Sequence, residues 1–145
     1  MTDTSQFCDP SSPQAGASAA DIEQGSRFLP KLDGDGLIGA VVTDHHTGTV
    51  LMFAWMNEEA LKLTFATGIV HFWSRSRGRL WKKGEESGNT LHVREARVDC
   101  DQDMLWIRAD VMGAGVACHT GAHSCFYRTI STDPDGALVL TRDEI

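Results

Sequence analysis

The sequence predicts an α+β domain, mostly antiparallel β-sheet with one main helix. Short runs rich in β-branched and aromatic residues recur along the chain, and polar or glycine-rich turns separate them. Of the 145 residues, 41% are hydrophobic, which is enough for a single domain with its own core. We expect that domain at residues 31–145, and a disordered tail at residues 1–30, which are rich in Ser, Ala, Pro and Gly.

The first predicted elements are two strands around a turn. The runs "LIGAVVT" and "TVLMFAW" flank "DHHTG", which is typical of a β-hairpin. A helix at about 58–67 follows, because Asn57 is a favoured N-cap, Glu58 and Glu59 suit the helix dipole, and Gly68 favours a stop. The remaining strands are expected in "IVHFW", "LHVREARVD", "MLWIRADVM", "CFYRTI" and "ALVLT".

Charge and composition argue against several classes of protein. A formal net charge of −7 argues against a general nucleic-acid binder. No apolar run approaches the ~20 residues of a membrane span, and "MTDTSQFCDP" lacks the basic and apolar regions of a secretory signal. We therefore expect a cytoplasmic protein with no membrane or nucleic-acid partner. Its four cysteines then favour metal binding, catalysis or burial over disulfides, and Cys8 in the tail is expected to have no role.

The segment "DCDQD" places Asp99, Asp101 and Asp103 at alternate positions. If the backbone is extended, the three carboxylates share one face and Cys100 points to the other. Carboxylates suit a hard cation such as Mg²⁺ and a thiolate suits zinc, so one segment could serve two metals. A solvated acidic turn is the alternative that this motif alone favours. An EF-hand loop is excluded because Met104 stands where glycine is needed.

The segment "GVACHTGAHSCF" brings Cys118, His119, His123 and Cys125 close together in the sequence. Alone, it is equally consistent with metal binding and with buried cysteines in a polar loop. With Cys100 added, three thiolates leave the fourth position of a tetrahedral zinc open to water, as in catalytic sites. Zinc lowers the pKa of such a water toward ~7, and zinc deaminases use this chemistry on adenine and cytosine rings. An adjacent histidine such as His119 could move the proton.

The segment "HFWSRSRGRLWKKGEESG" concentrates positive charge in an acidic chain. Arginine binds phosphate bidentately and tryptophan can stack on a base, so the segment suits a phosphorylated aromatic ligand. A solvated strand face with core tryptophans is the alternative. The candidate substrate-binding residues are Trp73, Ser74, Arg75, Ser76, Arg77, Lys82 and Lys83. Jointly, the three segments indicate hydrolytic attack on a phosphorylated purine or pyrimidine.

In order and spacing, "FWSRSRGRLWKKGEESG", "VDCDQD" and "ACHTGAHSCFYR" resemble the signatures of the phosphoribosyl-AMP cyclohydrolase family, from about Leu37 to Ile130. The resemblance implies hydrolysis of the N1–C6 bond of the adenine ring in 1-(5-phosphoribosyl)-AMP, a step of histidine biosynthesis. It also implies an intertwined homodimer in which both chains supply zinc ligands. The implied metal ligands are Cys100, Cys118 and Cys125 for Zn²⁺, and Asp99, Asp101 and Asp103 for Mg²⁺.

The residues and the resemblance predict the same mechanism. Water activated by zinc adds to C6, which is electrophilic because ribosylation of N1 gives the ring positive charge, and His119 is the predicted general base. One alternative is a zinc-dependent nucleotide deaminase, which the missing H-x-E…P-C-x-x-C signature disfavours. Another is a non-catalytic metal- or phosphate-binding module. The chain departs from the family pattern at Leu91, where glutamine is frequent, and at Ala122 and His123, where basic residues are common.

Overall fold

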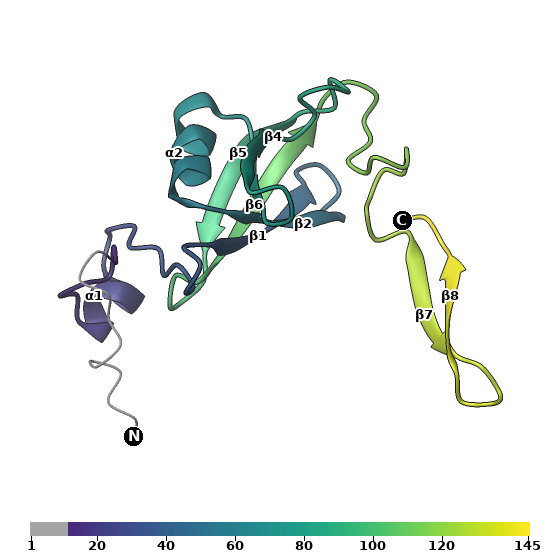
Figure 1. Cartoon of the computed structure of the whole chain (residues 1–145), viewed down its shortest axis with the longest axis horizontal. Helices are drawn as coiled ribbons and strands as arrows, with labels where there is room; N and C mark the ends of the chain where they lie inside the picture. Colours follow the sequence, from purple (N-terminus) through teal and green to yellow (C-terminus); the bar gives the residue numbers. More distant parts are fainter. Residues whose placement is uncertain (1–11) are drawn as a thin grey trace.

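The computed structural model describes residues 12–145, and a four-stranded sheet forms its centre (Figure 1). The strand order is β2–β1–β6–β5, formed by Val50–Met56, Ile38–Asp44, Met104–Val111 and Leu91–Val98. The outer pairs β2–β1 and β6–β5 are antiparallel, whereas β1 and β6 are parallel neighbours. The predicted α+β class with mostly antiparallel strands is therefore confirmed, with one parallel pair at the centre.

The predicted hairpin and helix are confirmed. β1 and β2 pair with each other across the turn that the sequence marks with "DHHTG". Helix α2 (Glu58–Thr67) begins where the Asn57 side chain accepts a hydrogen bond from the Ala60 N–H at 2.8 Å. It ends at Gly68, whose φ of 74° is a left-handed conformation that costs glycine little. These two caps fix the length of the helix.

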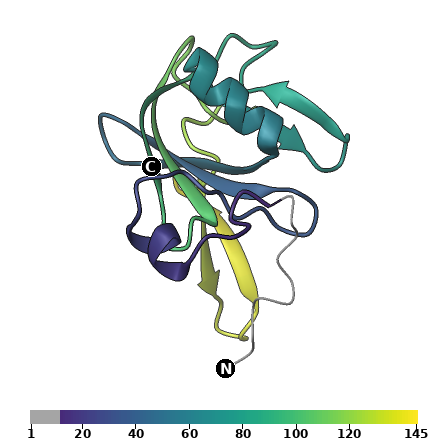
Figure 2. The same ribbon diagram turned by 90° about the vertical axis from the view of Figure 1, so that its left-hand side faces the viewer.

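Helix α2 packs beside the sheet and shares its core (Figure 2). Ala60 and Leu61 belong to one hydrophobic cluster with Leu51 of β2 and Ile107 of β6, and Phe72 of β3 is fully buried in it. Burying one such large side chain stabilises the fold by about 1.5–3 kcal/mol. The cluster thereby fixes β2 and β3, two of the strands that carry site residues.

A second sheet contains only two strands, β3 (His71–Ser74) and β4 (Arg79–Lys82), which pair antiparallel. β3 is predicted from the sequence and β4 is not, because a short run with arginine and lysine at its ends is typical of a solvated segment. The pairing of Trp73 with Leu80 makes this segment a hairpin. The β3–β4 hairpin carries most of the predicted substrate-binding residues.

Residues 99–103 form the turn between β5 and β6, so the expectation of an extended backbone there is wrong. Asp99 Oδ1 accepts hydrogen bonds from the backbone N–H groups of Asp103 and Met104, at 2.9 and 3.1 Å. Gln102 has a φ of 59°. Local bonds from an aspartate side chain bend a chain in this way. Strand alternation therefore does not apply to these residues, and it gives no reason to expect Cys100 to point away from the carboxylates.

Residues 12–30 belong to the segment predicted as a tail. In the structure they contain α1 (Ala19–Gln24), which begins with a capping box at Ser18. Leu29 is buried, at 5% exposure. Cys8 lies outside the described residues, and a domain boundary near residue 30 stays a prediction.

The last two strands, β7 (Arg128–Thr132) and β8 (Leu138–Arg142), form a hairpin that extends away from the central sheet (Figure 1). Every residue of both strands is exposed, including Ile130 at 69% and Leu138 at 76%. Within the described part of the chain, the two strands pair only with each other. No helix among residues 12–145 is long and apolar enough to cross a membrane.

Candidate active site

The three aspartates of the β5–β6 turn converge. One carboxylate oxygen from each of Asp99, Asp101 and Asp103 lies within 4.8 Å of the other two, and residues 12–145 contain no other such group of metal-binding side chains. Asp99 is held in place by the two backbone hydrogen bonds it accepts. Several carboxylate oxygens in one place suit a hard cation such as Mg²⁺. The turn therefore brings together the three aspartates predicted to bind magnesium. It does so by bending the backbone, whereas the prediction assumed an extended strand.

Because these carboxylates lie close together, the pKa of Asp103 is raised and that of Asp99 is lowered. A hydrogen bond with Asp99, together with slight desolvation and the neighbouring Asp101, raises the pKa of Asp103 to about 6. Burial raises the pKa of Asp99, but hydrogen bonds from Asp103 and from the backbone outweigh burial and hold that pKa below its ordinary value. Asp103 is therefore the carboxyl that takes up a proton first. A bound cation would relieve the repulsion that causes this difference.

Cys118 and Cys125 meet where one loop returns to β2. Ser124 Oγ donates a hydrogen bond to the Val50 carbonyl at 2.6 Å, and the Cys125 N–H donates to the Leu51 carbonyl at 2.7 Å. Ser124 is buried, at 2% exposure. These bonds seat the loop on the strand, and there each of the two thiols influences the pKa of the other.

The two thiols differ in acidity because their neighbours differ. Burial raises the pKa of Cys118, but Thr120, whose hydroxyl donates to Sγ at 3.0 Å, acts with Cys125 and Lys83 to hold that pKa below its ordinary value. Partial burial and the nearby Cys118 raise the pKa of the Cys125 thiol to about 11. Burial lowers the pKa of Lys83, and both cysteines oppose that effect. Two adjacent thiols beside a cation are a donor set that suits zinc.

Cys100 lies apart from this pair. It is exposed in the β5–β6 turn, beside a cavity of about 340 Å³ that Arg27 and Phe28 also line. Among the described residues, no group of metal-binding side chains combines it with Cys118 and Cys125. A single chain thus brings together two of the three predicted zinc ligands.

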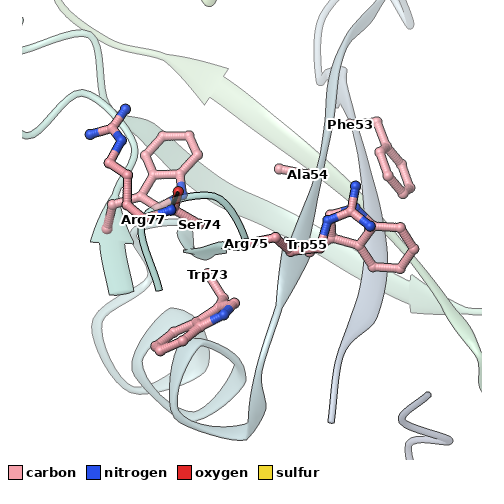
Figure 3. A pocket seen from close by; sticks show the side chains of 8 residues that line it. Phe53, Ala54, Trp55, Trp73, Ser74, Arg75 and Arg77 are labelled. Atoms are coloured by element: carbon pink, nitrogen blue, oxygen red, sulfur yellow. Dashed lines mark hydrogen bonds between the residues drawn. The ribbon is translucent and has the colours of Figure 1, made fainter. Parts of the chain in front are cut away.

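The basic β3–β4 hairpin faces β2 across a pocket of about 470 Å³ (Figure 3). Arg75 reaches across to β2, where its guanidinium carbon lies 4.8 Å from the centre of the Trp55 ring. Ser74 Oγ accepts a hydrogen bond from the Arg77 N–H at 3.2 Å. Aromatic walls with two guanidinium groups fit a phosphorylated aromatic ligand. The lining residues are Phe53, Ala54, Trp55, Trp73, Ser74, Arg75, Arg77 and Trp81.

The other predicted substrate-binding residues lie around this pocket or closer to the thiols. Ser76 is exposed in the hairpin turn, with its Oγ 3.4 Å from Ser74 Oγ. Lys82 ends β4, opposite His71. Lys83 acts on the two cysteines instead. The basic segment therefore serves two places, the pocket and the thiol pair.

Phe53 and Trp55 are site residues that the sequence analysis misses. It assigns "TVLMFAW" to a strand without a role in the site, yet Phe53 is 41% exposed and both rings line the pocket. Gly39 on β1 makes room for the Phe53 ring, because a Cβ at Gly39 would lie 2.7 Å from ring atoms. The available signal is the spacing, since aromatic residues two apart on a strand share one face.

The two histidines of the cysteine loop differ in their contacts. His123 Nδ1 lies 2.7 Å from the Gly115 carbonyl, and its Nε2 lies 3.3 Å from Asp44 Oδ2. His119 directly follows Cys118 and is exposed. Of the two imidazoles, His119 is therefore the one available to a ligand near the thiols.

Comparisons with known proteins agree on one family. The sequence model described as phosphoribosyl-AMP cyclohydrolase matches residues 52–127. A Brucella anthropi protein of that name is 62% identical over 109 residues, which cover 75% of this chain and 77% of the relative. A Sinorhizobium medicae protein of that name is 56% identical over 126 residues, covering 86% and 83%. A Brucella canis protein of that name is 55% identical over 123 residues, covering 84% and 88%.

Proposed function

Because the chain belongs to the phosphoribosyl-AMP cyclohydrolase family, we propose that its cysteine pair, its aspartate turn and its basic hairpin form one hydrolytic site. The activity is that of a C–N hydrolase in histidine biosynthesis, acting on 1-(5-phosphoribosyl)-AMP. The oxygen of water adds to C6 of the adenine ring, the N1–C6 bond breaks, and N1 gains a proton. The observation that carries the site is the Cys118–Cys125 pair beside Lys83, inside the matched segment.

Zinc is the proposed metal of the cysteine pair. The nearby Lys83 and the Thr120 hydroxyl both favour thiolate at Cys118, the form that binds metal. The proposed third ligand is Cys100 of a partner subunit, because Cys100 of the same chain lies apart in the β5–β6 turn. Zinc held by these three cysteines would supply a Lewis acid for water.

His119 is the proposed general base. It follows a proposed zinc ligand directly and exposes its imidazole, whereas the His123 ring is engaged by Gly115 and Asp44. Histidine is the side chain that most often transfers protons in enzymes. In this role His119 removes a proton from the attacking water.

Substrate binding is proposed for the pocket between β2 and the β3–β4 hairpin. Arg75 and Arg77 supply guanidinium groups for phosphate, and the rings of the wall supply stacking surface for the base. The full proposed set is Trp73, Ser74, Arg75, Ser76, Arg77, Lys82 and Lys83. The pocket and the cysteine loop share β2, because the loop docks at Leu51 and Phe53 lines the pocket, about 7 Å further along the strand.

Magnesium is the proposed cation of Asp99, Asp101 and Asp103, where it would help order the site or bind substrate phosphates. The convergence of the three carboxylates and the raised pKa of Asp103 support this proposal. Asp101→Asn should raise the Mg²⁺ concentration needed for activity while zinc content stays near wild type. An unchanged magnesium requirement would return the turn to a solvated acidic loop.

A homodimer is the proposed assembly. The separation of Cys100 from the other two cysteines and the exposed apolar residues of the β7–β8 hairpin support it. Sedimentation at working concentration should show a dimer, and a fully active monomer would contradict a shared site. A cytoplasmic location stays a prediction.

The decisive experiment follows ring opening of 1-(5-phosphoribosyl)-AMP by absorbance, with and without a metal chelator. We expect turnover that the chelator abolishes and that added zinc restores. Release of ammonia would instead indicate a deaminase. Binding of the substrate without turnover would indicate a metal- or phosphate-binding module.

A further inference from the structure

Gln102, within the aspartate turn, has a backbone conformation that side chains rarely adopt. Its φ of 59° lies in the left-handed region, and no other non-glycine residue among the described ones has a positive φ. Its N–H donates a hydrogen bond to the Asp99 carbonyl at 3.1 Å, and its carbonyl accepts one from the Lys31 N–H at 2.7 Å. A residue persists in such a conformation only where its surroundings over-determine it.

The Gln102 side chain supplies those surroundings. It is buried, and the residue is only 4% exposed. Oε1 accepts a hydrogen bond from the Leu29 N–H at 2.6 Å. Nε2 donates to the carbonyls of Ile22 and Arg27, at 2.9 and 3.4 Å. Every polar atom of Gln102 is thus bonded, and all three side-chain bonds lead to backbone atoms of the N-terminal segment, residues 12–31.

Gln14 connects the same two parts of the chain from the other side. Its Nε2 donates to the Asp101 carbonyl at 3.0 Å and to the Leu29 carbonyl at 2.9 Å. The bond to Asp101 uses a backbone atom of the turn, and neither Gln14 bond involves a carboxylate oxygen of the turn. The N-terminal segment therefore restrains the shape of the turn without competing for a cation.

We propose that Gln102 is a positioning residue through which the N-terminal segment holds Asp99, Asp101 and Asp103 ready for one cation. Three carboxylates repel one another, so a turn without this support spreads them over many arrangements and binds a cation more weakly. Side chains that orient metal ligands in this way typically change metal affinity by ~10–100-fold when they are replaced. The inference rests on the proposed magnesium site, but the support of the turn can be measured without metal.

The test compares Gln102→Gly with the wild-type full-length protein. Glycine favours the left-handed conformation, so this change removes the side-chain bonds without adding backbone strain. Asn89→Gly is the matched control, because Asn89 Oδ1 also joins two segments by accepting the Ala114 N–H, at 2.9 Å, away from the aspartate turn. Gln14→Ala is the second variant, since it removes the bond to Asp101, together with the bond to Leu29, and leaves the Gln102 side chain in place. Circular dichroism verifies that each variant is folded.

Two measurements decide the inference. Hydrogen exchange of the Asp103 and Met104 amides in metal-free protein should be faster in Gln102→Gly, and Mg²⁺ titration by calorimetry should show ~10–100-fold weaker binding. Gln14→Ala should change both in the same direction by less, and Asn89→Gly should change neither.

The inference is overturned if both Gln102→Gly and Gln14→Ala keep wild-type exchange at Asp103 and Met104. It is also overturned if wild-type protein binds Mg²⁺ and both variants bind it equally well. If wild-type protein binds no Mg²⁺, the magnesium site fails and with it the positioning role, even where exchange shows that Gln102 supports the turn.

Discussion

Magnesium binding should depend on pH through Asp103. The pKa of this carboxyl is raised to about 6 because Asp99 and Asp101 lie beside it, and a protonated carboxyl must lose its proton to bind a hard cation. When one proton competes with Mg²⁺ for this carboxylate, the apparent Kd for Mg²⁺ equals the Kd of the ionised form multiplied by a factor. That factor is one plus the ratio of protonated to ionised carboxyl. Lowering the pH from about 7.5 to about 5 should therefore weaken Mg²⁺ binding about tenfold. Calorimetric titration of the full-length protein at the two pH values measures this change.

Thermal stability gives a second measurement with a defined sign. The folded protein disfavours the ionised form of Asp103, so in the absence of metal this carboxyl stabilises the fold at low pH, and that contribution is lost as the pH rises through about 6. The proposed Mg²⁺ ion would bind only the ionised turn, and added Mg²⁺ should therefore raise the Tm more at pH ~7.5 than at pH ~5.

Asp103→Asn is the control for this pH dependence. The variant lacks the titrating group. It should therefore bind Mg²⁺ more weakly than wild type at both pH values, and the ratio of its Kd values at the two pH values should be near one. A wild-type Kd that stays constant over the same range would refute the assignment of the raised pKa to Asp103.

Other parts of the molecule give four further predictions. Cys118→Ser should lose most bound zinc, whereas His119→Ala should keep its zinc and lose ~10²–10⁴-fold in turnover rate. Measuring the zinc content and the turnover number of each purified variant tests both expectations. Trp55→Leu should raise KM about 2–5-fold through the lost arginine–ring contact, and steady-state kinetics should show no such change for Trp106→Leu, whose ring meets an arginine outside the pocket. Gly84→Ala should lower the Tm by roughly 4–8 °C in a thermal scan, because φ at Gly84 is +79° and a Cβ there would lie 2.3 Å from the backbone of Asn89. An unchanged Tm would contradict this reasoning.

The elements that the sequence predicts well are those with local signals. Asn57 and Gly68 cap α2 through bonds within a few residues, and such bonds can be inferred from residue type alone. The parallel pairing of β1 with β6 has no such signal. Apolar strand composition indicates burial but not which strand lies alongside, and this pair joins segments that are remote in the sequence.

The candidate site divides in the same way. Residue types in the motifs predict the aspartates, the cysteine pair and the basic segment, because the chemistry of these side chains follows from residue type alone. The turn that gathers the aspartates depends on Gln102 and on contacts with residues about 75 positions earlier, which no local pattern reports. Trp55 is missed because an aromatic residue in a strand is usually a core residue, whereas here its ring lines the pocket together with residues of the neighbouring hairpin.

The central parallel pair also affects how the chain folds while it is being made. β1 ends at Asp44 and β6 begins at Met104, so at ~5–20 residues per second the ribosome adds β6 roughly 3–12 s after β1. During that interval the β1–β2 hairpin has an apolar strand edge without its partner, and such an edge can pair with another nascent chain. Pairing across this separation also slows folding. The yield of folded protein in a cell should therefore depend on translation speed and on chaperones that cover this edge.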